Sequence, residues 1–310
     1  MRFALALVAV TLVGCATSLH PQQALVTDTF TRDQYGRFLL NVSVNGRTAR
    51  PFVVDSAASI SAVFESARDS LKLKPMGLTT IVHGIAASRE RGIYAVRKAE
   101  FAGHALDLQR VVVLPDPGSH ANLPVRPAGI LGQDVLTRYR ILFQRDGSVV
   151  AFFPAADAPA QIVGWDALPL IRGTTNRASR AVFFLPVDIE GHKANAIFDL
   201  GSGNNVVNWQ VARSAGLSVG DFPRQRQNAL EGIHDNTDAL PRFVAGDIRT
   251  QDTVWYEEVF VIADLPIFAT LGLSGQPAAL LGARLFSQRD FVLDLQRERI
   301  LLKSHEEDRR

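Results

Sequence analysis

The 310-residue sequence predicts a mostly β protein of two similar lobes, with few short helices. Two observations carry this prediction. Short runs rich in Val, Ile, Phe and Thr are separated by turn pairs such as Asn45-Gly46, and long stretches of helical periodicity are scarce. An apolar run also leads into an aspartate twice, at Asp55 and at Asp199, and small residues follow in both places. The chain therefore contains two copies of one structural unit.

Each copy is expected to start with a β-hairpin that delivers its aspartate, over residues 38–54 and 183–198. A helix is predicted after each aspartate, over residues 61–71 and 208–215. A second apolar run then ends in glycine at a similar distance from each aspartate. These runs are Ile130-Leu131-Gly132 and Leu280-Leu281-Gly282, and another hairpin closes each half.

The repeat sets the expected domain limits. We expect the first lobe to span residues 24–155 and the second to span 161–303, joined by a Pro- and Ala-rich linker. Residues 304–310 form a charged tail, and residues 1–15 form a signal peptide.

The N-terminus predicts export. A basic start, a short apolar run and the segment Leu12-Val-Gly-Cys15 resemble a bacterial lipobox, in which the cysteine is lipidated. The apolar run is shorter than the roughly 20 residues that a spanning helix needs. No aspartate follows Cys15, so the resemblance implies a lipid anchor on the periplasmic side of the outer membrane.

Composition argues against several other functions. A formal net charge of +2 with dispersed basic residues gives no reason to expect nucleic-acid binding. The seven histidines are scattered without close ligand spacing, so we expect no metal and no cofactor.

The ordered set of motifs resembles the retropepsin-like and pepsin-like aspartic protease family, in a tandem arrangement over about residues 35–303. In that family, an apolar strand, an Asp-Thr/Ser-Gly turn, a glycine-tipped flap and an apolar-apolar-Gly element form each half. The resemblance implies that Asp55 and Asp199 are the catalytic residues. It also implies residues that support the two active-site loops, namely Ser56, Ala57, Leu200, Gly201, Gly132 and Gly282. The substrate-binding flaps are implied at Gly84, Ile85, Gly232 and Ile233.

Two nearby carboxyl groups suit peptide hydrolysis, because one can stay protonated while the other activates a water molecule. The sequence departs from the family pattern at two positions. Ala57 replaces a glycine, which we expect to crowd the first turn, and Leu200 replaces a hydroxyl that braces the opposite loop. Ser56 keeps its hydroxyl, so half of this brace is expected to survive.

Two other motifs compete with this interpretation. Residues 199–203 resemble the glycine-rich loop of S-adenosylmethionine-dependent methyltransferases, although Asn205 stands where that loop wants glycine. Residues 216–220 match the nucleophile elbow of α/β-hydrolases around Ser218, but a predicted helix precedes them where a strand is required.

We therefore expect an aspartic endopeptidase that cleaves a peptide or protein in the cell envelope. The alternative is an inactive lipoprotein whose cleft binds a peptide or a partner protein. Since the tandem repeat supplies both aspartates, we expect a monomer, with the lipid anchor as its only membrane contact.

Overall fold

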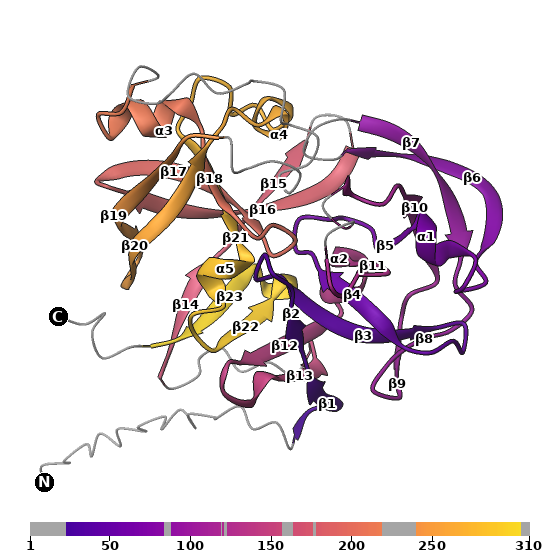
Figure 1. Ribbon diagram of the computed structural model, residues 1–310. Helices are drawn as coiled ribbons and strands as arrows, with labels where there is room; N and C mark the ends of the chain where they lie inside the picture. Colours follow the sequence, from indigo (N-terminus) through magenta and orange to yellow (C-terminus); the bar gives the residue numbers. More distant parts are fainter. Residues whose placement is uncertain are drawn as a thin grey trace, which may run out of the picture.

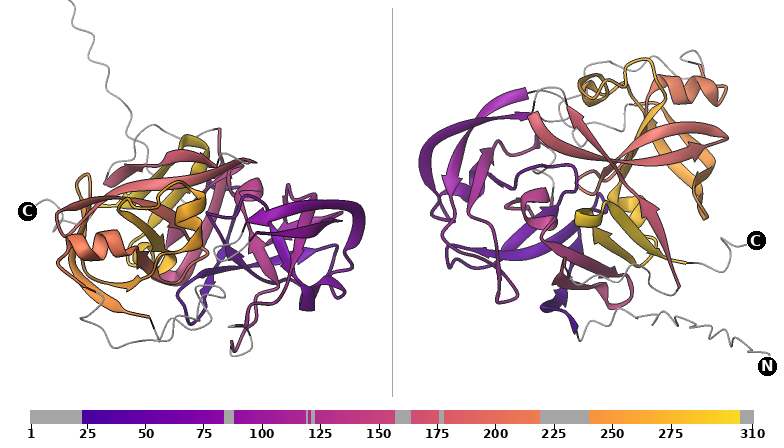
Figure 2. Two further views of the ribbon diagram at one scale, coloured as in Figure 1. Left: turned by 90° about the horizontal axis from the view of Figure 1, so that it is seen from above. Right: turned by 180° about the vertical axis from the view of Figure 1, so that it is seen from behind.

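The computed structural model describes residues 23–83, 88–118, 120, 123–156, 164–175, 178–218 and 240–304. Within these ranges the fold is mostly β, as predicted. Two lobes stand side by side, one from the N-terminal half of the chain and one from the C-terminal half (Figures 1 and 2). A third sheet, built from both halves, lies beneath them.

The first lobe is a ten-stranded sheet. Its strands are β2 (Thr31–Arg32), β3 (Phe38–Val44), β4 (Arg50–Val54), β5 (Ala62–Phe64), β6 (Lys74–His83), β7 (Ser88–Ala95), β8 (Ala99–Phe101), β9 (His104–Leu106), β10 (Arg110–Leu114) and β11 (Gly129–Leu131). Two short helices accompany it, α1 (Glu65–Arg68) and α2 (Gln133–Leu136). In this sheet β11 lies between β4, to which it is parallel, and β5, to which it is antiparallel.

The second lobe is a seven-stranded sheet. Its strands are β15 (Ile171–Thr175), β16 (Ala178–Ile189), β17 (His192–Asp199), β18 (Asn205–Val207), β19 (Arg242–Thr250), β20 (Thr253–Ile262) and β21 (Ala278–Gly282). The helices α3 (Trp209–Ser214), α4 (Pro266–Thr270) and α5 (Ala283–Phe286) lie around it. Strand β21 sits between β17 (parallel) and β18 (antiparallel), which repeats the pairing of β11 in the first lobe.

The closing hairpins of the two halves form the shared six-stranded sheet. Its strands are β1 (Val26–Thr29), β12 (Tyr139–Gln144), β13 (Val149–Pro154), β14 (Trp165–Pro169), β22 (Phe291–Asp294) and β23 (Arg299–Lys303), with 3₁₀ turns at Asp146–Ser148 and Leu295–Arg297. Strands β12 and β22 pair antiparallel at its centre, so the halves meet there. The ring of Phe143 stacks on that of Phe291 with centroids 4.7 Å apart, and Phe38 of the first lobe packs against both.

Both predicted hairpins are present, as β3–β4 and β16–β17. Their turns place Asn45 and Gly46, and likewise Glu190 and Gly191, at positive φ, which fits a tight two-residue hairpin turn. The predicted second helix is also present as α3, capped by the Asn208 side chain, with Gly216 at φ +80° after its end.

The helix predicted over residues 61–71 is wrong over its first part. Ala62, Val63 and Phe64 form strand β5 and are all buried, because they fill the sheet between β10 and β11. Only Glu65–Arg68 turn into the short helix α1. A run of three apolar residues is compatible with either structure, and its burial on both faces selects the strand.

Several predicted features lie outside the described residues. These are the signal peptide with Cys15, the flap positions Gly84, Ile85, Gly232 and Ile233, most of the linker and the end of the charged tail.

Candidate active site

Strand β4 delivers Asp55 to the first loop. The backbone N–H of Asp55 donates to the Leu131 carbonyl on β11, which fixes the end of the strand. One carboxylate oxygen, Oδ1, then accepts hydrogen bonds from the backbone N–H groups of Ala57 (3.0 Å) and Ala58 (2.8 Å). The turn therefore orients the carboxyl group with main-chain donors.

Strand β17 delivers Asp199 to the second loop in the same way. Asp199 is opposite Gly282 in the β17–β21 register, and its Oδ1 accepts from the Gly201 N–H at 2.8 Å. The residue is 4% exposed, so this carboxyl group is removed from bulk water.

The two loops bring their carboxyl groups into one site. A Cβ atom added to Gly201 would lie 2.5 Å from both Cγ and Oδ2 of Asp55. The Asp55 carboxyl group thus packs on the same glycine whose N–H binds Asp199 Oδ1. Gly201 allows this close approach because it has no side chain.

Ser56 braces the two loops across the lobes. Its hydroxyl donates to the Phe198 carbonyl at 3.0 Å and accepts from the Leu200 N–H at 2.9 Å. Both bonds are buried, so the hydroxyl satisfies two main-chain groups that are shielded from bulk solvent. This is the surviving half of the brace that the sequence predicted.

Leu200, at the position equivalent to Ser56, has a different environment. Its side chain is fully buried in the main hydrophobic core, alongside residues such as Phe198 and Leu281. It offers no hydroxyl to the first loop, so the cross-lobe brace is one-sided.

Ala57 is accommodated better than the sequence suggested. Its φ is not in the left-handed region, and its methyl group packs against the apolar cluster of the second lobe that contains Ile197 and Val261. Instead of crowding the turn, the methyl adds a contact between the lobes.

Gly132 and Gly282 support the two loops from behind. A Cβ at Gly132 would meet the Ala58 carbonyl oxygen at 2.7 Å, and one at Gly282 would meet the Asn204 carbonyl oxygen at 2.5 Å. Each glycine N–H donates to a side chain six residues after the aspartate of its own half: Ser61 Oγ at 2.9 Å and Asn205 Oδ1 at 3.0 Å. Only glycine fits between the loop and the strand at these positions.

The site also contains support that the sequence reasoning missed. Gln133 donates to the Ser56 carbonyl at 2.8 Å, and its N–H donates to the Ala58 carbonyl. Arg37 is 4% exposed and forms an ion pair of 2.6 Å with Asp33. The backbone of Tyr35, from the same segment, packs so closely on Gly203 of the second loop that a Cβ there would lie 2.3 Å from its oxygen. The short spacing between Asp33 and Arg37 was the only available signal.

Burial raises the pKa of both carboxyl groups, and that of Asp199 is raised further by the charge of Asp55. Burial, and then the charge of Asp55, raise the pKa of Asp199 to about 8, although N–H donors and Arg37 oppose the shift. Burial also raises the pKa of Asp55, against the Ala58 and Ala57 N–H groups and the Arg37 charge, which lower it. When the pair shares one proton, it is therefore held on Asp199, because the charge of Asp55 adds to the effect of burial there.

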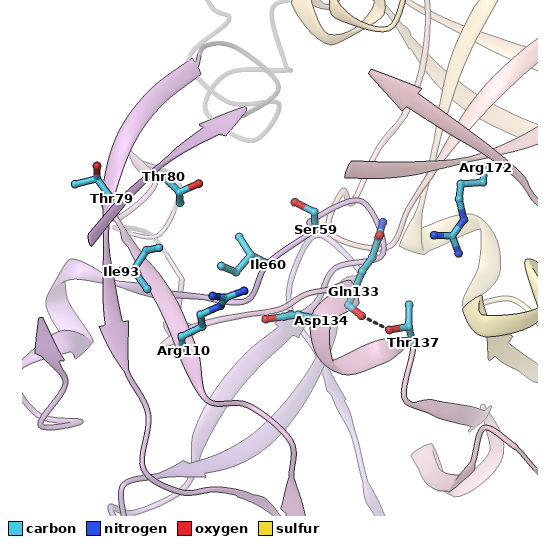
Figure 3. Close-up of a pocket in the computed structure, with 10 residues that line it drawn as sticks. All are labelled: Ser59, Ile60, Thr79, Thr80, Ile93, Arg110, Gln133, Asp134, Thr137 and Arg172. Carbon is cyan, nitrogen blue, oxygen red and sulfur yellow. Dashed lines mark hydrogen bonds between the residues drawn. The ribbon is translucent and has the colours of Figure 1, made fainter. Parts of the chain in front are cut away.

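A pocket of about 490 Å³ opens beside the first loop (Figure 3). It lies between Ser59 and Ile60, which follow the loop, and Thr79 and Thr80 on β6, with Arg172 approaching from the second lobe. Strands β6 and β7 form the hairpin that carries the predicted first flap, and β6 is the edge strand of its sheet.

The two competing motifs lie beside the wrong secondary structure for a methyltransferase loop or a nucleophile elbow. Residues 199–203 are followed by strand β18, where a methyltransferase loop needs a helix, and Ser218 comes after helix α3, where an elbow needs a strand. Within the described ranges, no group of three or more His, Cys, Asp and Glu side chains could hold a metal ion. The same ranges contain no helix with the length and apolar character to cross a membrane.

Comparison with known proteins agrees with this geometry. Residues 40–135 match the model of the aspartyl protease family. The crystal structure of the aspartic proteinase from Irpex lacteus is similar with a TM-score of 0.53 and 12% identity, over 91% of this chain and 98% of that one. The search of curated proteins found no significant match.

The structure thus defines a two-lobed fold of the pepsin-like aspartic proteinase type. The family similarity is carried by residues 40–135, and the shared fold extends over both lobes.

Proposed function

We propose that the protein is an aspartic endopeptidase that hydrolyses peptide bonds through a water molecule held between Asp55 and Asp199. The observation that carries this proposal is the packing of the Asp55 carboxyl group on Gly201, whose N–H binds Asp199. Two carboxyl groups on equivalent loops, with the charge of Asp55 raising the pKa of Asp199, are the arrangement that this reaction needs.

The proton distribution assigns a role to each aspartate. Asp199 holds the proton because the neighbouring Asp55 charge and burial raise its pKa. Ionised Asp55 takes a proton from the water as its oxygen attacks the peptide carbonyl carbon, and protonated Asp199 donates to the carbonyl oxygen. When the carbon–nitrogen bond breaks, the proton on Asp55 goes to the leaving amine and Asp199 regains its own proton from the new carboxyl group.

The fold also offers a place for an extended substrate. Strand β6 is an edge strand above the first loop, so its free main-chain groups can pair with a peptide that lies across the site. Cleavage of a peptide in this position needs no metal or cofactor.

The cellular location is part of the same proposal. The lipobox-like segment ending at Cys15 supports a lipidated protein on the periplasmic side of the outer membrane. Cys15→Ala should abolish labelling by radioactive palmitate and release the protein from the membrane fraction. Unchanged labelling in this variant would contradict lipidation at Cys15.

The direct test of the function is cleavage of an internally quenched peptide library from pH 3 to 8. We expect Asp55→Asn and Asp199→Asn each to lower kcat/KM by at least about a thousandfold, because each removes one of the two proton-transfer groups. Asp146→Asn is the matched control, since its side chain is 96% exposed in a turn of the first half. Full activity in both active-site variants would exclude this mechanism.

A second candidate function is peptide binding without cleavage, and Leu200 is the observation that favours it. Loss of the second brace is a change that an enzyme kept only for binding could tolerate. This candidate predicts that the wild type cleaves no library peptide but binds some of them by calorimetry, equally well with Asp199 or Asn at position 199.

A further inference from the structure

A buried arginine accompanies the aspartates, and the mechanism proposed above does not use it. Arg37 comes directly before strand β3 and is 4% exposed. In the antiparallel β3–β4 pair, Leu39 is opposite Val53. The same register carried two residues further places Arg37 opposite Asp55, where the two strands reach the first active-site loop. The arginine therefore belongs to the same end of the sheet as the Asp55 carboxyl group.

A tight turn holds this arginine in place. Asp33 Oδ2 accepts from Nε and pairs with Nη2 of Arg37, both at 2.6 Å, and the Arg37 and Asp33 side chains are 5% and 2% exposed. Asp33 Oδ1 accepts the main-chain N–H groups of Tyr35 and Arg37, both at 3.0 Å. The guanidinium carbon lies 5.4 Å from the centroid of the Tyr35 ring. The position of the guanidinium group is therefore fixed by its own turn.

The same turn also contacts the second lobe. The Tyr35 carbonyl oxygen packs on Gly203 of the second active-site loop, where a Cβ atom would lie 2.3 Å away. Gly36, at φ +84°, lies against helix α5, and a Cβ atom there would be 3.6 Å from Cβ of Arg284. The turn that carries Arg37 therefore reaches the Asp199 loop as well as the Asp55 loop.

The charged groups near Arg37 come from four elements: Asp33 on its own turn, Asp55 after β4, Asp199 at the end of β17 and Arg284 on α5. Burial raises the pKa of both aspartates, and the charge of Arg37, together with main-chain N–H donors, opposes this shift. The ion pair with Asp33 is neutral as a whole, so it acts through the unequal distances of its two ends. The register position of Arg37 makes the positive end the nearer one.

We propose that Arg37 is a positioning residue for the aspartate pair, and that it stabilises the ionised form of Asp55 in a site that otherwise disfavours charge. A buried carboxyl pair with no cation nearby would keep both protons up to a higher pH, and over that range it would lack its general base. Asp33 contributes by keeping the guanidinium group in place. This inference rests on the proposed peptidase function and specifies what sets its working pH.

The test is the pH dependence of kcat/KM for a quenched peptide from pH 3 to 9. Its main variant combines Asp33→Asn with Arg37→Gln, which removes the ion pair without leaving a buried charge unpaired. We expect both limbs of the profile to move to higher pH by roughly 0.5–1, because the arginine acts on both aspartates. Arg37→Gln alone should move them further, since Asp33 then keeps an uncompensated negative charge. Arg37→Lys keeps the positive charge and should move them least.

Arg299→Gln is the matched control. Arg299 pairs with Asp294 at 2.9 Å on the paired strands β22 and β23 of the shared sheet, and these side chains are 13% and 0% exposed. Loss of this buried pair should lower stability and leave the pH profile in place. A profile of the double variant at the wild-type pH would overturn the proposal, because the neutral ion pair would then have no net effect on the site. An equal shift in Arg299→Gln would overturn it as well.

Titration of ¹³C-labelled aspartate carboxyl groups by NMR, in the same variants, separates this proposal from the peptidase function. If the wild type cleaves nothing, higher titration midpoints of the Asp55–Asp199 pair in the double variant would still support the role of Arg37, while the peptidase proposal fails. Unchanged midpoints would overturn the role of Arg37, whether or not a peptide is cleaved.

Discussion

The Asp55 and Asp199 loops have the same position and different supports. Both follow a central strand, both direct main-chain N–H groups at one carboxylate oxygen, and both rest on a glycine that has no room for a Cβ atom. They differ in what joins them. Ser56 spans the lobes with two buried hydrogen bonds, whereas Leu200 points into the hydrophobic core. The fold therefore holds the carboxyl pair with one polar brace.

The two lobes also differ in the side chains that bind the supporting glycines Gly132 and Gly282. In the first lobe, Ser61 links Gly132 to Asp134 through hydrogen bonds. In the second lobe, Asn205 accepts from the Gly282 N–H and donates to the buried Glu258 at 3.3 Å. Burial raises the pKa of both of these acids, so each lobe supports its loop through a short polar relay with different residues. Equivalent geometry therefore does not require equivalent side chains.

Among changes to the supports of the two aspartates, the largest effect is expected at Gly201, which lies between the two carboxyl groups. Gly201→Ala places a Cβ atom 2.5 Å from the Asp55 carboxyl group, so one of them must move. We expect kcat/KM to fall by at least about a hundredfold, because a shift of about 1 Å at a reacting group has effects of this size. Activity within threefold of the wild type would show that the two loops do not meet as described.

Ser56→Ala tests the one-sided brace. It leaves the Phe198 carbonyl and the Leu200 N–H buried without their partner, and we expect a loss of about 2–4 kcal/mol in the free energy of unfolding. Urea denaturation measures this loss. Ser56→Thr is the control, since threonine keeps the hydroxyl. If Ser56→Ala unfolds at the same urea concentration as the wild type, the brace contributes nothing.

The proton held by Asp199 should make stability depend on pH. Its pKa is raised from 3.8 to about 8 on folding, so between these values the folded chain holds a proton that the unfolded chain releases. Stability should therefore fall as pH rises from about 4 to 8, by up to about 1.4 kcal/mol per pH unit from this group. Asp199→Asn should remove this part of the slope in denaturation curves, whereas Asp146→Asn should retain it.

The smallest effect is expected at Ala57. Ala57→Gly restores the family residue but removes a methyl group that packs between the lobes and adds backbone freedom to the unfolded chain. We expect a loss of about 0.5–1 kcal/mol in the free energy of unfolding. A clear gain in stability from this change would mean that alanine strains the loop after all.

The sequence predicted the repeat, both hairpins, both glycine-ended strands and the positions of the aspartates, because these depend on local patterns of apolar, small and turn residues. It did not predict strand β5, since burial decides between helix and strand for Ala62-Val63-Phe64. It also missed Arg37, whose charge acts on both aspartates, and Gln133, which donates to the Ser56 carbonyl. Both effects join segments that only the folded chain brings together. That Ala57 fits its loop without strain likewise depends on its packing against the second lobe.

The central claim is that Asp55 and Asp199 form one electrostatically coupled pair. Titration of ¹³C-labelled aspartate carboxyl groups by NMR tests this claim most directly. The account predicts that Asp199 titrates at about 8 in the wild type, and that Asp55→Asn lowers this pKa because the neighbouring charge is removed. An Asp199 resonance that titrates near 4, or that does not respond to Asp55→Asn, would contradict it.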